Sequence, residues 1–382
     1  MNLDIMPVDG GQSVLVGRVW DPDTQGPRVC IVESDGLVDI THRVSTTSWL
    51  MESPEVARDA AEGETLRWRV DDVVAGSLNV EKNRPHFLAP IDLQVTKACG
   101  VTFVGSLIER VIEEKCQGDA ERANAIRAEL LTALDGSLKG VKPGSAKATE
   151  VKRILIEQSL WSQYLEVGIG PDPEVFTKAP VLASVGWGAR VGIPAFSSWN
   201  NPEPELVLIC NSRGTPVGAT LGNDVNLRDV EGRSALLLGK AKDNNASSSL
   251  GPFIRLFDEH FNLDIASQEE ITLRVEGTDG FALEGRNSLS EISRPLTELV
   301  KAVHGVHHQY PDGFALYTGT LFAPTQDRSE PGSGFTHHKG DRVEISSPHL
   351  GTLVNTTWPT DELEPWDFGI GELFRYLSAN HS

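Results

Sequence analysis

The chain has 382 residues, 39% of them hydrophobic, and its 54 acidic and 34 basic residues give a formal net charge of −20. This charge argues against nucleic acid and against an anionic membrane surface as partners, because both would repel the protein. No apolar run approaches the ~18 residues of a membrane span, and the start of the chain lacks a basic segment followed by an apolar one. The four cysteines form no CxxC pair. We therefore expect a cytoplasmic protein with reduced thiols.

Residues 1–85 predict a small N-terminal α/β domain. Residues 14–20 and 27–41 are rich in β-branched residues and are separated by turn-forming residues, which is typical of a β-hairpin or meander. Residues 46–62 favour one or two short helices. This region shows no carboxylate, histidine or glycine pattern that indicates a site, so we expect it to have a structural role or to support a dimer.

Residues 86–382 predict a larger catalytic domain with a helical insertion at about residues 105–165. Apolar residues recur in the insertion at intervals of three and four, with a Gly/Pro-rich interruption. Short alternating segments such as residues 267–277 and 340–357 indicate strands, and residues 288–310 indicate a helix. Strands and helices do not alternate regularly along the chain, so the expected fold class is α+β.

Three carboxylates in residues 203–224 predict a metal site. Glu203 and Glu205 stand at the start of an apolar, β-prone segment and point to the same side of it. A turn at residues 211–214 leads into a second expected strand, which ends at Asp224. The oxygen ligands that converge from two paired strands favour a hard cation, and Mg²⁺ fits best. The alternative is that the glutamates are solvated acids at a strand end.

The order of several short motifs resembles the fumarylacetoacetate hydrolase family over roughly residues 86–358. These motifs are the Glu203-x-Glu205 pair, the run GNDVNLRD from Gly222 to Asp229, Lys242 ahead of Gly251-Pro252, and TGT at Thr318 to Thr320. The resemblance implies a mixed β-roll and a homodimer or homotetramer. It also implies that Glu203, Glu205 and Asp224 bind Mg²⁺, with Mn²⁺ or Ca²⁺ as substitutes.

One departure from the family separates this chain from the hydrolases. Those enzymes usually carry a histidine that activates water, and the corresponding segment here, GVTFVGSLIER, has Ser106 and Arg110 but no histidine. This segment and three others, EVFTKAPVL, WNNPEPELVL and GNDVNLRDVEGRSALLLGKAKDNNAS, are similar to bacterial 2-keto-3-deoxy-pentonate dehydratases. The resemblance implies a hydro-lyase of pentose catabolism, which converts a small 2-keto sugar acid to 2-oxoglutarate semialdehyde (2,5-dioxopentanoate).

Dehydration of a 2-keto acid requires a base at carbon 3 and an acid for the hydroxide that leaves carbon 4. Glu174, in the Pro-flanked segment GPDPEVFTKAP, is the candidate for these proton transfers, and the alternative is a loop salt bridge between Glu174 and Lys178. We expect Lys242 to act as a catalytic cation at the carboxylate or enolate oxygen. We expect the substrate to be bound by Ser106, Arg110, Lys178 and Thr320, with the Thr320 hydroxyl on its carboxylate.

Two other functions remain open from the sequence. One is a carbon–carbon hydrolase of a 2,4-diketo-3-deoxy sugar acid or an acylpyruvate, which would use the same metal together with an activated water. The other is a non-catalytic protein whose metal only stabilises the fold, although an ion with open coordination positions suits a structural role poorly.

Overall fold

The structure is a computed structural model of the chain. It describes residues 5–10, 13–33, 36–79, 83–123, 126–127, 141–157, 159, 161–322, 324–328 and 334–380.

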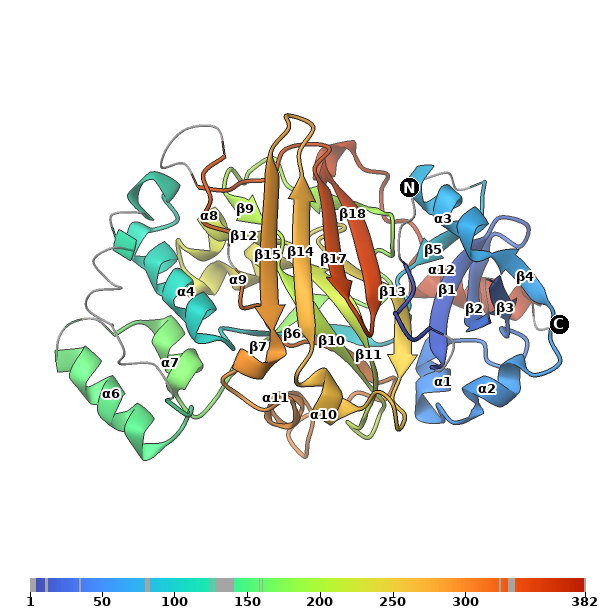
Figure 1. Cartoon of the computed structure of the whole chain (residues 1–382), viewed down its shortest axis with the longest axis horizontal. Coiled ribbons are helices and arrows are strands. Elements are labelled where there is room, and N and C mark those ends of the chain that lie inside the picture. Colours follow the sequence, from blue (N-terminus) through green and yellow to red (C-terminus); the bar gives the residue numbers. More distant parts are fainter. Residues whose placement is uncertain are drawn as a thin grey trace.

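One large sheet of eleven strands runs through the molecule (Figure 1). In spatial order its strands are β4 (Leu66–Arg69), β3 (Gly36–Asp39), β2 (Gly26–Glu33), β1 (Leu15–Asp21), β13 (Ser248–Leu256), β11 (Pro216–Asp224), β10 (Pro204–Cys210), β16 (Phe314–Tyr317), β6 (Val95–Gly100) and β7 (Glu174–Ala179), while β5 (His86–Leu88) pairs with β1. Its described neighbours are antiparallel except β16 and β6, which are parallel. The central strands β10, β11 and β13 are almost completely buried, because both of their faces are covered.

A second sheet covers one face of the central strands (Figure 1). Its order is β15 (Ala282–Ser288), β14 (Glu270–Glu276), β17 (Arg342–Ser347), β18 (Gly351–Pro359) and β8 (Arg190–Ile193). Buried and less buried residues alternate along β14 and β17, as expected for strands with one face toward a core. Leu206, Leu221 and Phe253 of the large sheet share that core with Leu273 and Leu353. The sequence therefore correctly predicted strands in residues 267–277 and 340–357.

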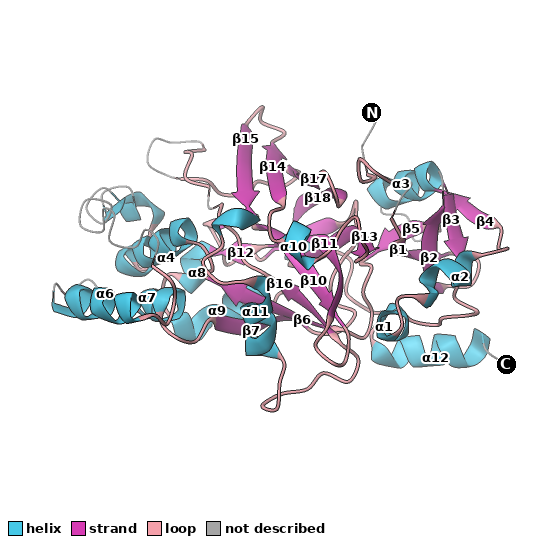
Figure 2. Ribbon diagram, turned by 60° about the horizontal axis from the view of Figure 1, so that its bottom comes forward, coloured by secondary structure: helices cyan, strands magenta, loops and turns pink. Residues whose placement is uncertain are grey.

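The N-terminal residues form an antiparallel meander with helices, as the sequence predicted. Strands β1, β2 and β3 pair in succession, and the helices of this region are α1 (Thr47–Glu52), α2 (Val56–Ala61) and α3 (Val70–Asn79). The last helix, α12 (Ile370–Asn380), returns to this end of the molecule (Figure 2). Strand β1 also pairs with β13, so the meander continues the large sheet. A domain division near residue 85 stays a prediction.

The helical excursion forms the opposite end of the molecule (Figure 1). Its described helices include α4 (Val104–Cys116), α6 (Ala146–Glu157) and α7 (Gln163–Ile169). Leu107 and Val111 of α4 share an apolar cluster with Leu165 of α7 and with Trp199. This packing fixes the face of α4 that carries Ser106 and Arg110 toward the sheet, where both side chains are buried.

Short elements complete the fold around the sheets. They are β9 (Asn200–Asn201), β12 (Asn226–Leu227), α8 (Arg228–Glu231), α9 (Leu238–Lys242), α10 (Leu263–Ala266) and α11 (Leu296–Val303), with 3₁₀ turns at Ala235–Leu237, Leu289–Glu291 and Thr360–Glu362. The helix expected over residues 288–310 is thus shorter than predicted. None of the helices in the described part of the chain has the length and apolar character to span a membrane. All four cysteines are buried and unpaired.

Candidate active site

The three predicted metal ligands converge at the paired ends of β10 and β11. The register aligns Glu205 with Gly222, and the backbone N–H of Asp224 donates to the carbonyl of Glu203 at 3.0 Å. One carboxylate oxygen from each of the three acids lies within 4.8 Å of the other two. All three side chains are buried, with at most 3% of any residue exposed, so the reading of solvated strand-end acids is wrong.

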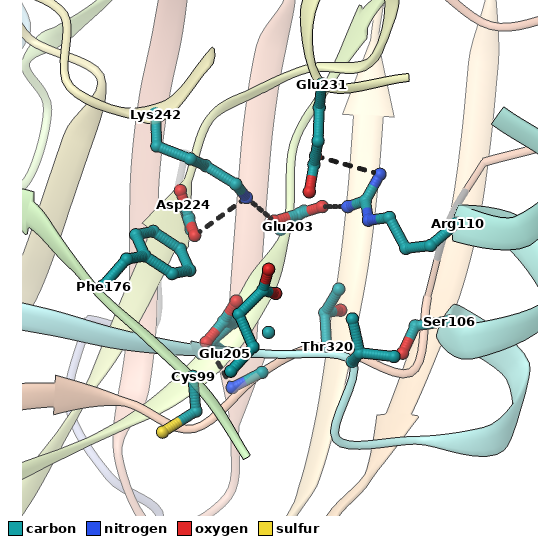
Figure 3. A pocket seen from close by; sticks show the side chains of 14 residues that line it. Cys99, Ser106, Arg110, Phe176, Glu203, Glu205, Asp224, Glu231, Lys242 and Thr320 are labelled. Carbon is teal, nitrogen blue, oxygen red and sulfur yellow. Dashed lines mark hydrogen bonds and ion pairs between the residues drawn. The ribbon is translucent and has the colours of Figure 1, made fainter. Parts of the chain in front are cut away.

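The three carboxylates lie close together in a buried site (Figure 3). Burial raises the pKa of Glu205 well above its ordinary value, and the negative charges of Asp224 and Glu203 add to this effect. Burial also acts on Asp224, but the ammonium groups of Lys178 and Lys242 overcome it and lower the pKa. The Lys242 ammonium lies 2.5 Å from Glu203 Oε2 and 3.0 Å from Asp224 Oδ2.

This donor set fits a hard divalent cation. It offers only carboxylate oxygens, which are the ligands that Mg²⁺ and Ca²⁺ prefer. Glu205 accepts a 2.6 Å hydrogen bond from the backbone N–H of Gly319, which fixes its carboxylate while leaving its second oxygen available. A cation among these three acids would offset the repulsion that raises the pKa of Glu205.

Arg110 connects α4 to this cluster (Figure 3). Its guanidinium pairs with Glu203, with Glu113 at 2.5 Å and, more distantly, with Glu231 Oε2 at 3.3 Å. Glu113 also accepts a 2.6 Å hydrogen bond from Arg228. The helical excursion therefore contributes to the site, which the sequence indicated only through Ser106 and Arg110.

Glu174 begins strand β7, although the sequence favoured a loop. It lies opposite Gly100 of β6, and a Cβ atom at Gly100 would stand only 1.7 Å from Glu174 Oε2. The carboxyl group therefore occupies the space that a side chain at position 100 would fill. Burial raises the pKa of Glu174 to about 7, the negative charge of Glu231 adds to this, and Arg110 and Lys242 oppose it.

Lys178 lies behind Asp224 and not in the pocket. Its ammonium is 2.8 Å from Asp224 Oδ1 and donates to the backbone carbonyls of Val225 at 3.0 Å and Lys242 at 2.5 Å. Among the described residues its ion pair is with Asp224, so the alternative of a salt bridge between Glu174 and Lys178 is wrong. Lys178 also lies outside the residues that line the pocket, so its role in binding the substrate stays a prediction.

The cluster opens into a pocket with about 320 Å³ of empty space, counting the part open to solvent. The structure brings eight of the nine predicted site residues into its lining: Ser106, Arg110, Glu174, Glu203, Glu205, Asp224, Lys242 and Thr320. The Ser106 hydroxyl donates to the Phe103 carbonyl at 3.0 Å, and the Thr320 hydroxyl accepts from the backbone N–H of Phe322 at 3.2 Å. No histidine occurs among the described residues that line the pocket.

Six further residues that the sequence did not indicate as site residues also line the pocket: Cys99, Gly100, Val101, Phe176, Glu231 and Gly319. Glu231 had the clearest signal, because it is an acid that follows the GNDVNLRD run by two residues. The other five are small or apolar, and they reach the pocket through the pairing of β6 with β7 and with β16.

Two curated relatives resemble about half of this chain. A probable 2-keto-3-deoxyxylonate dehydratase of Haloferax volcanii is 32% identical over 200 residues, which cover 52% of this chain and 65% of the relative. A 2-dehydro-3-deoxy-D-arabinonate dehydratase of Saccharolobus solfataricus is 31% identical over 182 residues, or 48% of this chain and 57% of the relative. The chain thus spans about three fifths of the length of these relatives.

Solved structures and a family comparison agree on the fold. The apo form of a 2-keto-3-deoxy-D-arabinonate dehydratase aligns with a TM-score of 0.64 and 19% identity over 90% of this chain and 99% of that one. The same named enzyme, complexed with magnesium and 2,5-dioxopentanoate, aligns with a TM-score of 0.63, 19% identity and the same coverage. Residues 157–357 match the family described as fumarylacetoacetate (FAA) hydrolase C-terminal, and with this match over more than half of its residues the chain belongs to the fumarylacetoacetate hydrolase family.

Proposed function

We propose that this protein is a metal-dependent dehydratase that converts a 2-keto-3-deoxy-pentonate to 2,5-dioxopentanoate. The observation that carries the proposal is the position of Glu174, a carboxyl group with a pKa of about 7 in the same pocket as the three buried acids. Such a group is suited to accept and return a proton near neutral pH. The names of the two curated relatives and of the similar structures support the same reaction.

The residues divide the work by their chemistry. Glu203, Glu205 and Asp224 would hold the cation, with Mg²⁺ as the best fit and Mn²⁺ or Ca²⁺ as substitutes. When bound, this ion would withdraw electrons from the 2-keto acid and make its carbon-3 protons more acidic. Glu174 removes one of these protons.

The remaining lining groups bind the substrate. Lys242 supplies a positive charge for the carboxylate or enolate oxygen. Ser106, Arg110 and Thr320 contact the substrate from the pocket wall, with the Thr320 hydroxyl on its carboxylate. We assign Lys178 a different role from the one its sequence suggested, namely to hold Asp224 in place.

A carbon–carbon hydrolase of a 2,4-diketo-3-deoxy sugar acid or an acylpyruvate is the second candidate. It would use the same cation and the same enolate, but it also needs a group to activate water. The lining described above lacks the histidine that resemblance assigns to that task in the hydrolases, and this favours dehydration.

A product assay tests the proposal. Purified protein is incubated with D- and L-2-keto-3-deoxy-pentonates and Mg²⁺, and the products are identified by NMR. We expect a single semialdehyde; pyruvate with a second carboxylic acid from the diketo substrate would support the hydrolase instead. Chelation should abolish turnover while far-UV circular dichroism stays unchanged, whereas unfolding on chelation would indicate a structural ion.

The assembly and location of the protein are also proposals. We infer a homodimer or homotetramer from the resemblance to the family, and a cytoplasmic location from the four buried, unpaired cysteines. Light scattering of the purified protein measures the first of these.

A further inference from the structure

Glu231 lines the pocket, and none of the roles above uses it. It ends the short helix α8, and only 2% of the residue is exposed. Its Oε2 lies 3.3 Å from Arg110 Nη1, but this oxygen makes no hydrogen bond within the described structure. In Figure 3 its side chain points toward Arg110 and Glu203.

Glu113 shows what a structural carboxylate looks like in the same network. It is also completely buried and also pairs with Arg110. In contrast to Glu231, it accepts hydrogen bonds from Arg110 at 2.5 Å and from Arg228 at 2.6 Å, and it lies outside the pocket lining. Two charged donors hold such a group in place, whereas no described residue donates to Glu231 Oε2, and Glu231 faces the pocket.

A buried carboxyl group without hydrogen-bond donors favours its protonated form. Burial raises the pKa of Glu231, although Arg110 and Lys242 partly oppose this. A protonated carboxyl group can donate a hydrogen bond to a hydroxyl, which an ionised one cannot do. A substrate hydroxyl is the partner that this pocket would supply.

We propose that Glu231 is a second proton-transfer residue, which protonates the 4-hydroxyl group of the sugar acid as it leaves while Glu174 takes the carbon-3 proton. The inference rests on the proposed function. It identifies the substrates as 2-keto acids that carry a hydroxyl at carbon 4 and excludes those that lack one.

The proton balance closes over the two stages of the reaction. In the first stage, Glu174 takes a proton from carbon 3, the C4–O bond breaks, and the oxygen leaves as water with the proton of Glu231, which gives a C3=C4 double bond. In the second stage, the Glu231 carboxylate takes a proton from carbon 5 and Glu174 returns its proton to carbon 3. The double bond moves to C4=C5, and this enol tautomerises to the aldehyde with both carboxyl groups in their starting states.

The test compares proton exchange with dehydration in Mg²⁺-loaded protein. Exchange of carbon-3 protons is followed by NMR in D₂O with 2-oxopentanoate, which has no 4-hydroxyl group, and dehydration is followed with the 2-keto-3-deoxy-pentonate. Glu231→Gln should exchange at the native rate but dehydrate about 10²–10⁴-fold more slowly, the usual contribution of a general acid. Glu174→Gln should lose both activities.

Glu113→Gln is the matched control, because it changes a carboxylate on the same Arg110 outside the pocket. The kcat/KM of this variant for dehydration should fall by less than about tenfold relative to the native protein. Glu109→Gln, which removes a 3.1 Å ion pair with Arg228, replaces it if Glu113→Gln does not fold. Thermal unfolding adds a readout independent of activity: Glu231→Gln should be at least as stable as the native protein, because it replaces a buried carboxyl group whose Oε2 accepts no hydrogen bond.

The outcomes separate this inference from the proposed function. The inference is overturned if Glu231→Gln dehydrates within about threefold of the native rate, or if it loses exchange and dehydration equally. If Glu231→Gln has a lower melting temperature than the native protein, and Glu113→Gln loses as much dehydration activity as Glu231→Gln does, then Glu231 only positions Arg110. Native protein that exchanges carbon-3 protons but forms no semialdehyde would overturn the proposed function, and this inference with it.

Discussion

At the scale of single residues, the position of the Glu174 carboxyl group depends on Gly100, which lies opposite it on the neighbouring strand. Because Gly100 has no side chain, the carboxyl group of Glu174 can lie over the backbone of β6 and reach the pocket. The neighbour that a new Cβ would meet is the end of a flexible side chain, so a larger residue would displace the carboxyl group and leave the sheet intact.

Gly100→Ala should therefore reduce catalysis with little loss of stability. We expect kcat to fall about 10²-fold, which is the lower range for losing a general base, while the melting temperature changes little. Enzyme assays and calorimetry measure the two effects. Gly239→Ala is the control, because a Cβ there meets nothing within 4 Å; an equal loss of activity in both variants would contradict the positioning role of Gly100.

The raised pKa of Glu174 predicts how activity depends on pH. Only the ionised form can accept a proton, and the pKa of about 7 means that this form declines as the pH falls through neutrality. The value of kcat/KM should therefore fall as the solution becomes more acidic. The midpoint of this fall should lie below pH 7 when a bound cation favours the ionised carboxylate. Titration of ¹³C-labelled metal-free protein should show one glutamate with a midpoint near 7 that disappears in Glu174→Gln.

The same shift has a consequence for stability. The folded state binds a proton at Glu174 more tightly than the unfolded state does, since the pKa is raised. The contribution of this group is therefore fully present below its ordinary pKa of about 4.3 and is lost as the pH rises to about 7. The difference in stability between native protein and Glu174→Gln, measured by urea unfolding, should follow this direction.

Loss of the Glu205 carboxylate should change stability in opposite directions with and without the ion. Glu205→Gln removes a carboxylate whose pKa burial has raised, so the metal-free variant should be as stable as the native protein or more so. The gain in stability that Mg²⁺ gives, about 2.7 kcal/mol at a hundredfold excess over Kd, should vanish in Glu203→Gln, Glu205→Gln and Asp224→Asn. Calorimetry with and without Mg²⁺ measures this, and Glu174→Gln should keep the gain. A full Mg²⁺ effect in any of the three would remove that residue from the ligand set.

At the scale of elements, Lys178 joins three parts of the chain beneath the site. Its side chain leaves β7 and reaches Asp224 at the end of β11, the carbonyl of Val225 and the carbonyl that ends α9. Burial lowers the pKa of Lys178, whereas Asp224 raises it. The lysine thus places one metal-binding strand relative to the helix that carries Lys242.

Lys178→Met should weaken the fold as well as the site. Removing one partner of a buried ion pair usually costs about 3–5 kcal/mol, because the other charge and the carbonyls stay buried without a donor. The free energy of unfolding should fall by this amount in urea. Lys97→Met on the adjacent strand β6, where the ammonium donates to the Thr177 hydroxyl at the surface, should change it by less than about 1 kcal/mol. Equal effects of the two changes would contradict the assigned role.

At the scale of the whole molecule, the N-terminal meander and the catalytic strands share one sheet. Strand β1 pairs with β13 through Leu15 and Val16, and apolar residues from both regions contribute to the same two cores. Arg255 of β13 is buried and pairs with Asp9 at 2.7 Å. Separation of the two regions would expose the edge of β13 and both cores.

We therefore expect one cooperative unfolding transition. Calorimetry should give equal van't Hoff and calorimetric enthalpies, and Asp9→Ala should shift the whole transition downward. Two transitions, with only the first shifted by Asp9→Ala, would show that residues 1–85 unfold as an independent domain.

The sequence by itself determined the residues that meet through local pairing. Glu203, Glu205 and Asp224 could be placed together because one turn joins the two strands that carry them, and an antiparallel hairpin brings their ends to one edge. The N-terminal meander was predictable for the same reason. The absence of a histidine from residues 100–110 also pointed to dehydration without any knowledge of distances.

Only the tertiary structure decided the groups that surround this hairpin. Glu174 and Lys178 are four residues apart, and on an extended strand this spacing separates their backbones by about 13 Å. The segment forms β7, so the two side chains do not make a salt bridge. Arg110 and Glu231 come from α4 and α8, and no local pattern fixes which helix face packs on a distant strand. That choice follows from the burial of apolar side chains such as Leu107 and Trp199, and the charges of the site are placed by this packing.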